Sequence, residues 1–449
     1  MELSRKKVLV LGVGDTGISA VRYLQSKGAE VVAADTRENP PRAAELSIPV
    51  AAGPFTESLL GGVDLVVLSP GLSLDEPVVR EASRRKIPVL GDVELFAIEI
   101  SKRSPVPRVI AITGSNGKST VTSMVGEMCR KAGLDTVVAG NIGLPVLDTL
   151  EKNAAVYVLE LSSFQLETVK SLDAGSATVL NLSEDHLDRY ASMREYALAK
   201  SAIFAGKGIQ VLNREDPKVM AMRLPGRKTL TFGLSVPKDE SEYGLIPEGQ
   251  NTWLARGKKR LLKASDLKVA GLHNAENALA ALALCSDLPE EMLVQALAEF
   301  RGLPHRVEKI GEAAGVVFFD DSKGTNVGAT VAALTGMGGK SVLILGGEGK
   351  GQDFSPLRDP IESHARAVVL IGRDAPLIER AVKGVSVPVL HASGMVEAVD
   401  AAFKAAKKGD AVLLSPACAS FDMFRNYVHR AEAFVAAFRQ LEGGACTRP

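Results

Sequence analysis

The chain has 449 residues, with 53 basic and 53 acidic side chains, so its formal net charge is zero. Its hydrophobic fraction of 46% and charged fraction of 24% are typical of a globular protein with about two to four domains. Zero net charge argues against a protein that binds nucleic acid or a membrane surface, because both usually carry a basic excess. No apolar run approaches the roughly 20 residues that span a bilayer.

The cysteines and the N-terminus add two exclusions. The four cysteines form no CxxC pair, which argues against a zinc site or a disulfide framework. The first residues, MELSRKK, lead into a short apolar run and do not resemble a signal peptide. We therefore expect a cytoplasmic protein.

Apolar, strand-like runs alternate with amphipathic stretches along the whole chain, which predicts parallel sheets covered by helices. The runs are 8–11, 31–34, 63–68, 109–112, 136–139, 156–161, 177–180, 316–319, 342–345, 368–371 and 411–414. Prolines and basic residues interrupt the pattern at 100–108, and the sequence RGLPH interrupts it again at 301–305. The sequence thus predicts three α/β domains, at residues 1–98, 99–302 and 303–449.

The first motif is a glycine-rich turn after the first apolar run. Residues 8–17 read VLVLGVGDTG, which places Gly12, Gly14 and Gly17 between a strand and an amphipathic helix. Such glycines allow a diphosphate to approach the helix N-terminus closely. Asp35 ends the next strand, where a dinucleotide-binding enzyme places its ribose-binding acid. The motif alone leaves open both a dinucleotide site and a turn that binds nothing.

A second glycine-rich loop carries a lysine and hydroxyl groups. Residues 109–120 read VIAITGSNGKST, an apolar strand that runs into a loop and then a helix. Backbone N–H groups of such a loop cradle phosphates, Lys118 reaches the β and γ oxygens, and the Ser119 hydroxyl ligates Mg²⁺. The loop departs from the usual pattern, because Ile112 stands where the first glycine belongs. Its strand–helix context favours a phosphate-binding loop over a chance match.

Acidic and histidine side chains follow the next two strands of the same predicted domain. Glu160 ends one strand, and EDHLDRY at 184–190 follows the other. Glu160 and His186 are suitable ligands for Mg²⁺ or Mn²⁺ at the phosphates. A lone histidine is more often structural, and the acidic run is also compatible with a solvated helix start. Lys200 has no local pattern around it and is interpreted from the residues alone as a surface lysine.

The last third offers three polar loops at predicted strand ends. They read DDSKGTN at 320–326, GGEGKG at 346–351 and SPACASFDMFRNY at 415–427. Their lysines and hydroxyls favour a pocket that binds a small carboxylate. The alternative is that all three loops are simply solvated. Cys418 has no histidine partner in the sequence pattern, so we expect a buried core residue there and not a nucleophile.

Together these motifs resemble the Mur ligase family over the whole chain. The motifs shared widely among such ligases are TGSNGKST at 113–120, GNIGLP at 140–145, ELSSFQLE at 160–167 and DHLDRY at 185–190. The motifs more specific to members that add D-glutamate are GDVELF at 91–96, GLPHR at 302–306, DSKGTN at 321–326 and SPACASF at 415–421.

The resemblance implies a fold and an activity. The expected fold is a Rossmann-like N-terminal domain, a central parallel-sheet domain like that of P-loop ATPases, and a Rossmann-like C-terminal domain. The implied activity is the ATP-dependent addition of D-glutamate to UDP-N-acetylmuramoyl-L-alanine through an acyl phosphate, in the cytoplasmic synthesis of peptidoglycan precursors. ATP and Mg²⁺, or Mn²⁺, are the implied cofactors, and a monomer that acts on small molecules is expected.

The resemblance also implies site residues, in four groups. The ATP site comprises Gly114, Ser115, Asn116, Gly117, Lys118, Ser119, Thr120, Asn277, Arg306 and Asp321. The UDP-sugar site comprises Gly14, Asp15, Thr16, Asp35, Thr36, Arg37, Gly71, Asn141, Ser162 and His186. The D-glutamate site comprises Lys323, Thr325, Lys350, Ser420, Phe421 and Tyr427, the last at a position where phenylalanine is common. The metal ligands are Ser119, Glu160, His186 and Lys200 as a carbamate, and the catalytic residues are Lys118, Glu160, His186 and Lys200.

Three alternative functions are weighed against this interpretation. A dinucleotide-dependent oxidoreductase has no use for the loop at 114–120. A sibling ligase, such as a folylpolyglutamate synthase or a Mur ligase that adds another amino acid, is disfavoured by the motifs at 91–96 and 415–421. A UDP-sugar-binding protein without catalysis is disfavoured by the complete set of Lys118, Glu160 and His186.

Overall fold

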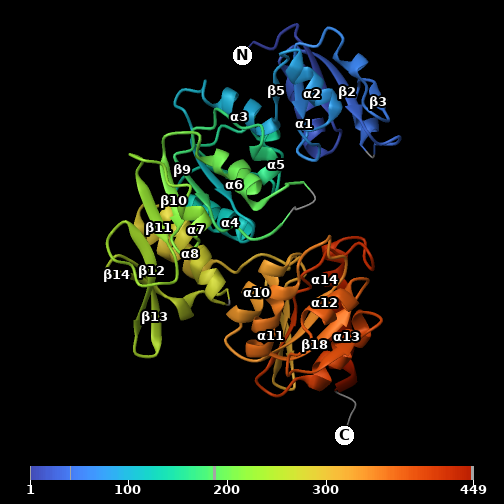
Figure 1. Ribbon diagram of the computed structural model, residues 1–449. Coiled ribbons are helices and arrows are strands. Elements are labelled where there is room, and N and C mark those ends of the chain that lie inside the picture. Colours follow the sequence, from blue (N-terminus) through green and yellow to red (C-terminus); the bar gives the residue numbers. More distant parts are fainter. Residues whose placement is uncertain (1, 41, 186–188, 270, 446–449) are drawn as a thin grey trace.

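The computed structural model describes residues 2–40, 42–185, 189–269 and 271–445. Three lobes follow one another along the chain, and each is built around its own sheet (Figure 1). Most strand pairs are parallel and helices cover the sheets, so the predicted three-part α/β fold is confirmed. None of the described helices is long and apolar enough to cross a membrane.

The N-terminal lobe contains a five-stranded parallel sheet in the order β3-β2-β1-β4-β5. Its strands are β1 (Lys7–Leu11), β2 (Glu30–Asp35), β3 (Val50–Ala52), β4 (Leu65–Leu68) and β5 (Val89–Leu90). Its helices are α1 (Asp15–Ser26), α2 (Pro77–Arg84) and α3 (Asp92–Ile100). The chain winds in opposite directions on the two sides of β1, and ligands bind at such a switch point.

The central lobe contains a nine-stranded sheet in the order β14-β13-β12-β11-β10-β9-β6-β8-β7. Its strands are β6 (Arg108–Thr113), β7 (Thr136–Gly140), β8 (Val156–Glu160), β9 (Ser176–Val179), β10 (Ile209–Asn213), β11 (Thr229–Phe232), β12 (Glu242–Glu248), β13 (Asn251–Arg256) and β14 (Lys259–Lys263). Its helices are α4 (Lys118–Lys131), α5 (Ser163–Leu166), α6 (Met193–Ser201), α7 (Pro217–Met220), α8 (Leu272–Leu284) and α9 (Glu290–Glu299). Strands β12 to β14 pair antiparallel and extend one edge.

The C-terminal lobe contains a six-stranded sheet in the order β15-β16-β20-β17-β18-β19. Its strands are β15 (Glu308–Ala313), β16 (Val316–Asp320), β17 (Ser341–Gly346), β18 (Ala365–Ile371), β19 (Val389–His391) and β20 (Ala411–Leu414). Its helices are α10 (Val327–Gly336), α11 (Arg358–His364), α12 (Ala375–Ala381), α13 (Met395–Ala405) and α14 (Tyr427–Ala445). Among the described strands of this sheet, only β15 pairs antiparallel to its neighbour, β16.

The apolar periodicity of the sequence corresponds to real buried faces. In α1, Ile18, Val21 and Leu24 are buried against the first sheet, as their spacing predicts. In α4, Met124 and Met128 lie on the buried face with the neighbouring valines. Strands such as β4, β8 and β17 are buried along their whole length, which explains why they read as continuous apolar runs.

The turn between β1 and α1 depends on glycine. Gly12 has a φ of +87°, in the left-handed region that favours glycine. A Cβ on Gly17 would lie 1.8 Å from the carbonyl oxygen of Gly12, which leaves no room for any side chain. Gly14, by contrast, has no heavy atom within 4 Å of the position of its Cβ. The turn is therefore tightly closed at Gly17 and open at Gly14.

Gly17→Ala should lower the free energy of unfolding by about 1–3 kcal/mol, because two backbone segments must separate to admit the methyl group. Gly14→Ala is the matched control and should leave the thermal unfolding midpoint close to that of the wild type. Thermal unfolding of the two variants side by side tests this. Equal midpoints for the two variants would show that the close contact at Gly17 is not structurally required.

Candidate active site

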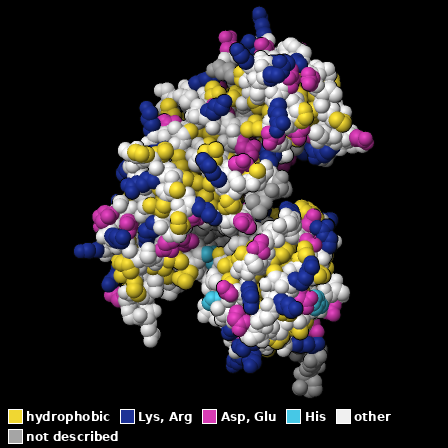
Figure 2. Space-filling view, viewed as in Figure 1, with side chains coloured by type: hydrophobic (Ala, Val, Ile, Leu, Met, Phe, Trp, Pro, Cys, Tyr) yellow, Lys and Arg dark blue, Asp and Glu magenta, His cyan; other side chains and the backbone are white. Residues whose placement is uncertain are grey.

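Two cavities lie at the carboxyl ends of the strands. The larger, of about 720 Å³, is lined by loops of the central and C-terminal lobes. The smaller, of about 600 Å³, lies between the glycine turn of the N-terminal lobe and the central lobe. In the space-filling view, the surface is hollowed between the N-terminal and C-terminal lobes (Figure 2). Asn141, Ser162 and Phe164 line both cavities, so the cavities adjoin one another.

The loop that follows β6 has the shape of a phosphate cradle. Gly117 has a φ of +83° and caps the N-terminus of α4, which aims backbone N–H groups at the larger cavity. The Lys118 ammonium donates to the carbonyl oxygens of Gly114, at 2.9 Å, and Ser115, at 2.8 Å. Burial lowers the pKa of Lys118, and the nearby carboxylates of Glu160 and Asp185 oppose this shift. The loop therefore presents a positive charge to an incoming anion.

Lys200 lies at the same loop, so its interpretation as a surface lysine was wrong. Its side chain is only 1% exposed, and its ammonium donates to Gly114 O at 3.0 Å and Thr113 Oγ1 at 3.2 Å. Burial, and then the charge of Lys118, hold the pKa of Lys200 well below its usual value. The hydrogen-bond partners of Lys200 lie on β6 and its loop, distant in sequence, which explains why the local pattern did not reveal them.

Glu160 presents a free carboxylate oxygen at the larger cavity. Its Oε1 accepts a hydrogen bond of 2.7 Å from the Asn141 amide. Its Oε2 is buried and has no hydrogen-bond partner among the described residues. An uncompensated oxygen beside Ser119 and Asp185 fits a hard divalent cation, which prefers such ligands. His186, the other expected ligand, lies outside the described residues.

Arg306 reaches the phosphate loop from the C-terminal side. Its guanidinium donates to Ser119 Oγ at 2.8 Å, across 187 positions of sequence. The residues on either side, His305 and Val307, have φ values of +62° and +52°, an uncommon backbone conformation for such side chains. This strained segment turns the Arg306 side chain toward α4 of the central lobe.

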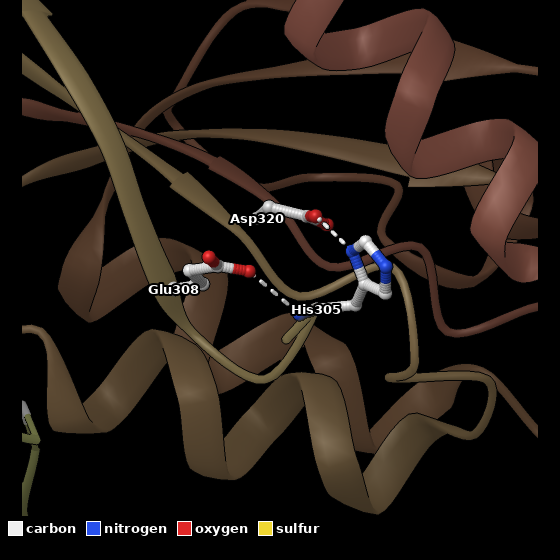
Figure 3. A group of neighbouring side chains, drawn as sticks. All are labelled: His305, Glu308 and Asp320. Carbon is white, nitrogen blue, oxygen red and sulfur yellow. Dashed lines mark hydrogen bonds and ion pairs between the residues drawn. The ribbon is translucent and has the colours of Figure 1, made fainter. Parts of the chain in front are cut away.

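His305 ties that segment to the C-terminal sheet (Figure 3). Its Nδ1 lies 2.7 Å from Asp320 Oδ2, its backbone N–H donates to Glu308 Oε2 at 2.9 Å, and its carbonyl accepts from the N–H of Lys323. The ligand atoms of His305, Glu308 and Asp320 lie within 4.8 Å of one another, a spacing that a metal ion would also require. Their mutual hydrogen bonds account for that spacing, so we assign the group to holding Arg306.

Residues expected to bind the amino acid are divided between the cavity and its surroundings. Lys323, Thr325, Lys350 and Tyr427 line the larger cavity, and the Lys323 ammonium lies 3.8 Å from the centre of the Tyr427 ring. Ser420 and Phe421, which were also expected there, do not line the larger cavity. Ser420 is buried, and Phe421 is 65% exposed.

Expected ATP-site residues show a similar division. Ser115, Asn116, Gly117, Lys118, Ser119 and Arg306 line the larger cavity. Gly114, Thr120, Asn277 and Asp321 do not line it. The Asn277 amide packs against Gly117, where a Cβ would lie 2.5 Å from its oxygen, so it supports the loop from behind. Asp321 is buried and accepts a 2.6 Å hydrogen bond from Ser415 Oγ.

The smaller cavity contains the described residues that were expected to bind the UDP-sugar. They are Gly14, Asp15, Thr16, Asp35, Thr36, Arg37, Gly71, Asn141 and Ser162. The Asp35 carboxylate accepts hydrogen bonds from the Arg37 guanidinium and from the N–H of Val13. The Arg37 guanidinium lowers the pKa of Asp35 to about 2. Since Asp35 is paired with Arg37, it is not a free acceptor for a dinucleotide ribose.

Two residues that organise the larger cavity and its loops, Tyr196 and Arg430, are not predicted by the sequence patterns. Tyr196 lines the cavity, with its hydroxyl 3.2 Å from Ser115 Oγ and its ring 4.7 Å from the Lys200 ammonium. Arg430 is 1% exposed and donates to the carbonyl oxygens of Ser322 and Cys418, which joins two polar loops. A buried arginine within a helix has no local sequence pattern. Cys418 itself is buried, as expected, and burial raises the pKa of its thiol to about 12.

Comparison with known families identifies the class of protein to which this fold and site belong. The Mur ligase MurD-like N-terminal domain matches residues 6–91, the Mur ligase middle domain matches 112–285, and the Mur ligase glutamate ligase domain matches 305–418. The chain belongs to the Mur ligase family, which confirms the expected resemblance.

Individual relatives make the comparison more specific. The chain is 56% identical to the UDP-N-acetylmuramoylalanine–D-glutamate ligase of Nitrosospira multiformis, over 98% of this chain and 97% of the relative. It is 55% identical to the ligase of the same name from Methylobacillus flagellatus, over 98% of each chain.

Solved structures at lower identity share the fold. The UDP-N-acetylmuramate-alanine ligase MurC of Thermotoga maritima matches with a TM-score of 0.60 at 21% identity, over 97% of this chain and 99% of that one. The MurF ligase of Thermotoga maritima, solved in complex with ADP, matches with a TM-score of 0.60 at 17% identity, over 98% of this chain and 99% of that one. The expected three-domain fold class agrees with both.

The buried carboxyl of Asp321 should make the free energy of unfolding depend on pH. Burial raises its pKa from 3.8 to about 7, so the folded chain binds a proton more tightly than the unfolded chain. The free energy of unfolding therefore falls as pH rises from about 4 to 7. The loss is on the order of 4 kcal/mol, at 1.36 kcal/mol per unit of pKa shift. Asp321→Asn keeps an acceptor for Ser415 and should unfold at a higher temperature than the wild type above pH 7, with the difference shrinking toward pH 4.

Thermal unfolding between pH 4 and pH 8.5 measures this difference. Asp359→Asn, at an exposed position of α11, is the matched control and should show no such trend. A constant difference between Asp321→Asn and the wild type across that range would mean that Asp321 ionises as freely in the folded chain as in the unfolded one.

Proposed function

We propose that this chain is an ATP-dependent ligase that joins D-glutamate to UDP-N-acetylmuramoyl-L-alanine, with ADP and phosphate as products, in peptidoglycan precursor synthesis. The single observation that carries the proposal is the adjoining pair of cavities. One is lined by the phosphate loop and by lysines of the C-terminal lobe, and the other by the glycine turn of the N-terminal lobe. The names of the close relatives support the substrates.

The UDP-sugar would occupy the smaller cavity. The open face of the turn at Gly14 admits a diphosphate to the N-terminus of α1, where backbone N–H groups and the helix dipole favour negative charge. The far end of the substrate would then extend toward Asn141 and Ser162, which line both cavities. That position brings the alanyl carboxylate to the edge of the larger cavity.

ATP would bind with its phosphates in the loop at 114–120. A carboxylate is a poor acyl donor, so an oxygen of the alanyl carboxylate first attacks the γ-phosphorus and ADP leaves. Phosphoryl transfer depends mainly on positioning and on charge neutralisation, which Lys118 and Arg306 supply from two sides. The amine of D-glutamate then attacks the acyl phosphate, and the tetrahedral intermediate expels phosphate.

The second substrate would bind on the C-terminal side of the same cavity. Lys323, Thr325 and Lys350 offer two ammonium groups and a hydroxyl to the carboxylates of D-glutamate, and charge-assisted hydrogen bonds of this kind are strong. Tyr427 packs beside Lys323 and limits where its ammonium can lie. Ser420 and Phe421 complete the proposed pocket when the lobes close on the substrates. Closure would also exclude water from the acyl phosphate.

We assign divalent-cation binding to Ser119, Glu160, His186 and Lys200, the last as a carbamate. The free Oε2 of Glu160 and the hydroxyl of Ser119 suit Mg²⁺ or Mn²⁺, which would supply neutralisation of phosphate charge. Carbamate formation requires a neutral amine, whose nitrogen bonds to the carbon of CO₂ with release of a proton. The lowered pKa of Lys200 favours that neutral form.

The remaining assignments concern the chain as a whole. We propose that the domains are residues 1–98 for the UDP-sugar, 99–302 for ATP and 303–449 for D-glutamate. We propose that the protein acts in the cytoplasm as a monomer. The oxidoreductase alternative is not favoured, because Asp35 is paired with Arg37 and the phosphate loop has no role in hydride transfer.

Substrate specificity tests the proposed function. Phosphate release from ATP should require UDP-N-acetylmuramoyl-L-alanine together with D-glutamate. It should be at least about tenfold slower with L-glutamate, D-alanine or diaminopimelate, because each misplaces or lacks a charged group that the pocket would pair. Faster turnover with diaminopimelate than with D-glutamate would assign the chain to a different member of the family.

Lys118→Ala should abolish ATP turnover and leave the fold intact, because the ammonium stabilises charge that develops in the transition state. Lys131→Ala, at the far end of the same helix, is the matched control and should retain wild-type turnover. Phosphate release and circular dichroism measure the two effects. Near-normal turnover in folded Lys118→Ala would remove the assignment of the phosphate loop.

A further inference from the structure

Two motifs of the central lobe end in residues that the proposed site does not use. ELSSFQLE ends in Glu167, just after α5, and DHLDRY ends in Arg189 and Tyr190. The Arg189 Nη2 donates to Glu167 Oε2 at 2.7 Å, and the Tyr190 hydroxyl donates to Glu167 Oε1 at 2.7 Å. Both oxygens of the carboxylate are therefore paired. The side chains of Arg189 and Glu167 are only 14% and 12% exposed, so the ion pair is largely buried.

The same guanidinium also reaches the N-terminal lobe. Its Nη2 donates to the carbonyl oxygen of Leu72 at 2.7 Å, across 117 positions of sequence. Leu72 belongs to the loop of residues 69–72, which follows β4 and lines the smaller cavity. One nitrogen of Arg189 thus joins a carboxylate of the central lobe to a backbone oxygen of this loop.

The loop at 69–72 packs in turn against the glycine turn that is proposed to hold the diphosphate. The Ser69 hydroxyl donates to the carbonyl oxygen of Gly12 at 2.8 Å, and the N–H of Leu72 donates to the carbonyl oxygen of Ser69 at 3.0 Å. A Cβ on Gly12 would lie 2.9 Å from the Ser69 Cβ, so the two segments are in direct contact. A shift of the loop would therefore change the wall of the smaller cavity beside the turn.

Arg189 also contacts an aromatic side chain that the two cavities share. Its guanidinium carbon lies 4.8 Å from the centre of the Phe164 ring, and that ring stacks on Tyr190 with the ring centres 6.0 Å apart. Phe164 lines both cavities. Because a cation is attracted to the face of an aromatic ring, Arg189 holds Phe164 at the place where the cavities adjoin.

Stability alone is a poor explanation of this ion pair. The cost of removing two charges from water offsets much of their attraction, and an apolar pair could fill the same space without that cost. A guanidinium offers several N–H donors in a fixed plane, so it can bind the Glu167 carboxylate and the Leu72 carbonyl oxygen together. The arrangement is therefore better explained by the segments that it holds in place.

We propose that Arg189, held by Glu167, is a positioning residue for the UDP-sugar substrate: it fastens the loop at 69–72 to the central lobe and fixes the Phe164 ring where the two cavities adjoin. The inference rests on the proposed function, because the smaller cavity is assigned to that substrate. Arg189 acts on the wall of the cavity and takes no part in phosphoryl transfer. It sets the shape of the passage from the glycine turn toward the phosphate loop.

Steady-state kinetics test the inference. Arg189→Ala should raise the KM for UDP-N-acetylmuramoyl-L-alanine about tenfold, with the KM for ATP and for D-glutamate within about twofold of the wild type. Arg189→Lys keeps the charge but replaces the planar fork with a single ammonium, so the same KM should rise only about threefold.

Arg108→Ala is the matched control. Arg108 also pairs with a carboxylate, that of Asp287 at 2.6 Å, and donates to a backbone oxygen, that of Leu284 at 3.1 Å. It begins β6, at the end of the strand opposite to the phosphate loop. Its loss should leave all three KM values within about twofold of the wild type, since the contacts removed are similar but lie away from the cavities.

A double-mutant cycle tests whether Glu167 acts through Arg189. Glu167→Gln keeps an acceptor oxygen but removes the charge that holds the guanidinium, so it should raise the KM for the UDP-sugar about threefold. In the Arg189→Ala background it should have no further effect. Additive effects of the two substitutions, or an equal rise of all three KM values in Arg189→Ala, would overturn the inference.

Amide hydrogen exchange without substrate follows the loop itself. The backbone N–H groups of Ser69 and Leu72 are hydrogen-bonded, and in Arg189→Ala they should exchange at least about fivefold faster than in the wild type. Arg108→Ala should leave their exchange unchanged. Wild-type exchange at both amides in folded Arg189→Ala would also overturn the inference. If Arg189→Ala does not fold, Arg189→Lys replaces it in both measurements.

Failure of the proposed function would give a different result. A wild-type protein that does not bind UDP-N-acetylmuramoyl-L-alanine would refute that function, whereas the exchange of Ser69 and Leu72 would still test the contact between Arg189 and the loop.

Discussion

Two lysine ammonium groups donate to the same carbonyl oxygen, that of Gly114, and the proposed chemistry depends on that arrangement. Lys118 approaches it at 2.9 Å from the start of α4, and Lys200 approaches at 3.0 Å from α6. Burial lowers the pKa of both lysines, and the charge of Lys118 lowers the pKa of Lys200 further. The pair is relieved by an anionic ligand such as a triphosphate, or by conversion of one lysine into an anion. In the proposed mechanism, the loop is therefore prepared for phosphate before any substrate arrives.

The surrounding structure directs further groups to that loop. The phosphate loop leaves β6, the third strand from one edge of its sheet. Glu160 ends β8 and Asn141 follows β7, and these are the two strands between β6 and that edge. Arg306 crosses from the C-terminal side to Ser119, held by the His305–Asp320 pair. The lysines proposed for D-glutamate lie on the same lobe as Arg306. That lobe therefore already contacts the loop through Arg306 and carries the proposed D-glutamate lysines with it.

Sequence patterns predicted eleven of the described strands and the phosphate loop because these depend on local apolar runs and glycine spacing. They did not predict β3, β5, β10 to β15 or β19, which are short, partly exposed or interrupted by polar residues. They also misjudged Lys200, since its hydrogen-bond partners Thr113 and Gly114 lie on β6 and the loop after it, far from Lys200 in sequence. Arg430 was missed for the same reason, because its partners Ser322 and Cys418 lie on other elements.

The fate of one oxygen atom tests the central claim, that the two cavities bring the alanyl carboxylate to the γ-phosphate of ATP. UDP-N-acetylmuramoyl-L-alanine labelled with ¹⁸O in its free carboxylate should transfer one labelled oxygen to the inorganic phosphate released with D-glutamate. The label arrives because a carboxylate oxygen attacks the γ-phosphorus and later leaves with it. Mass spectrometry of the phosphate measures the transfer. Amide product formed with phosphate free of ¹⁸O would contradict the account.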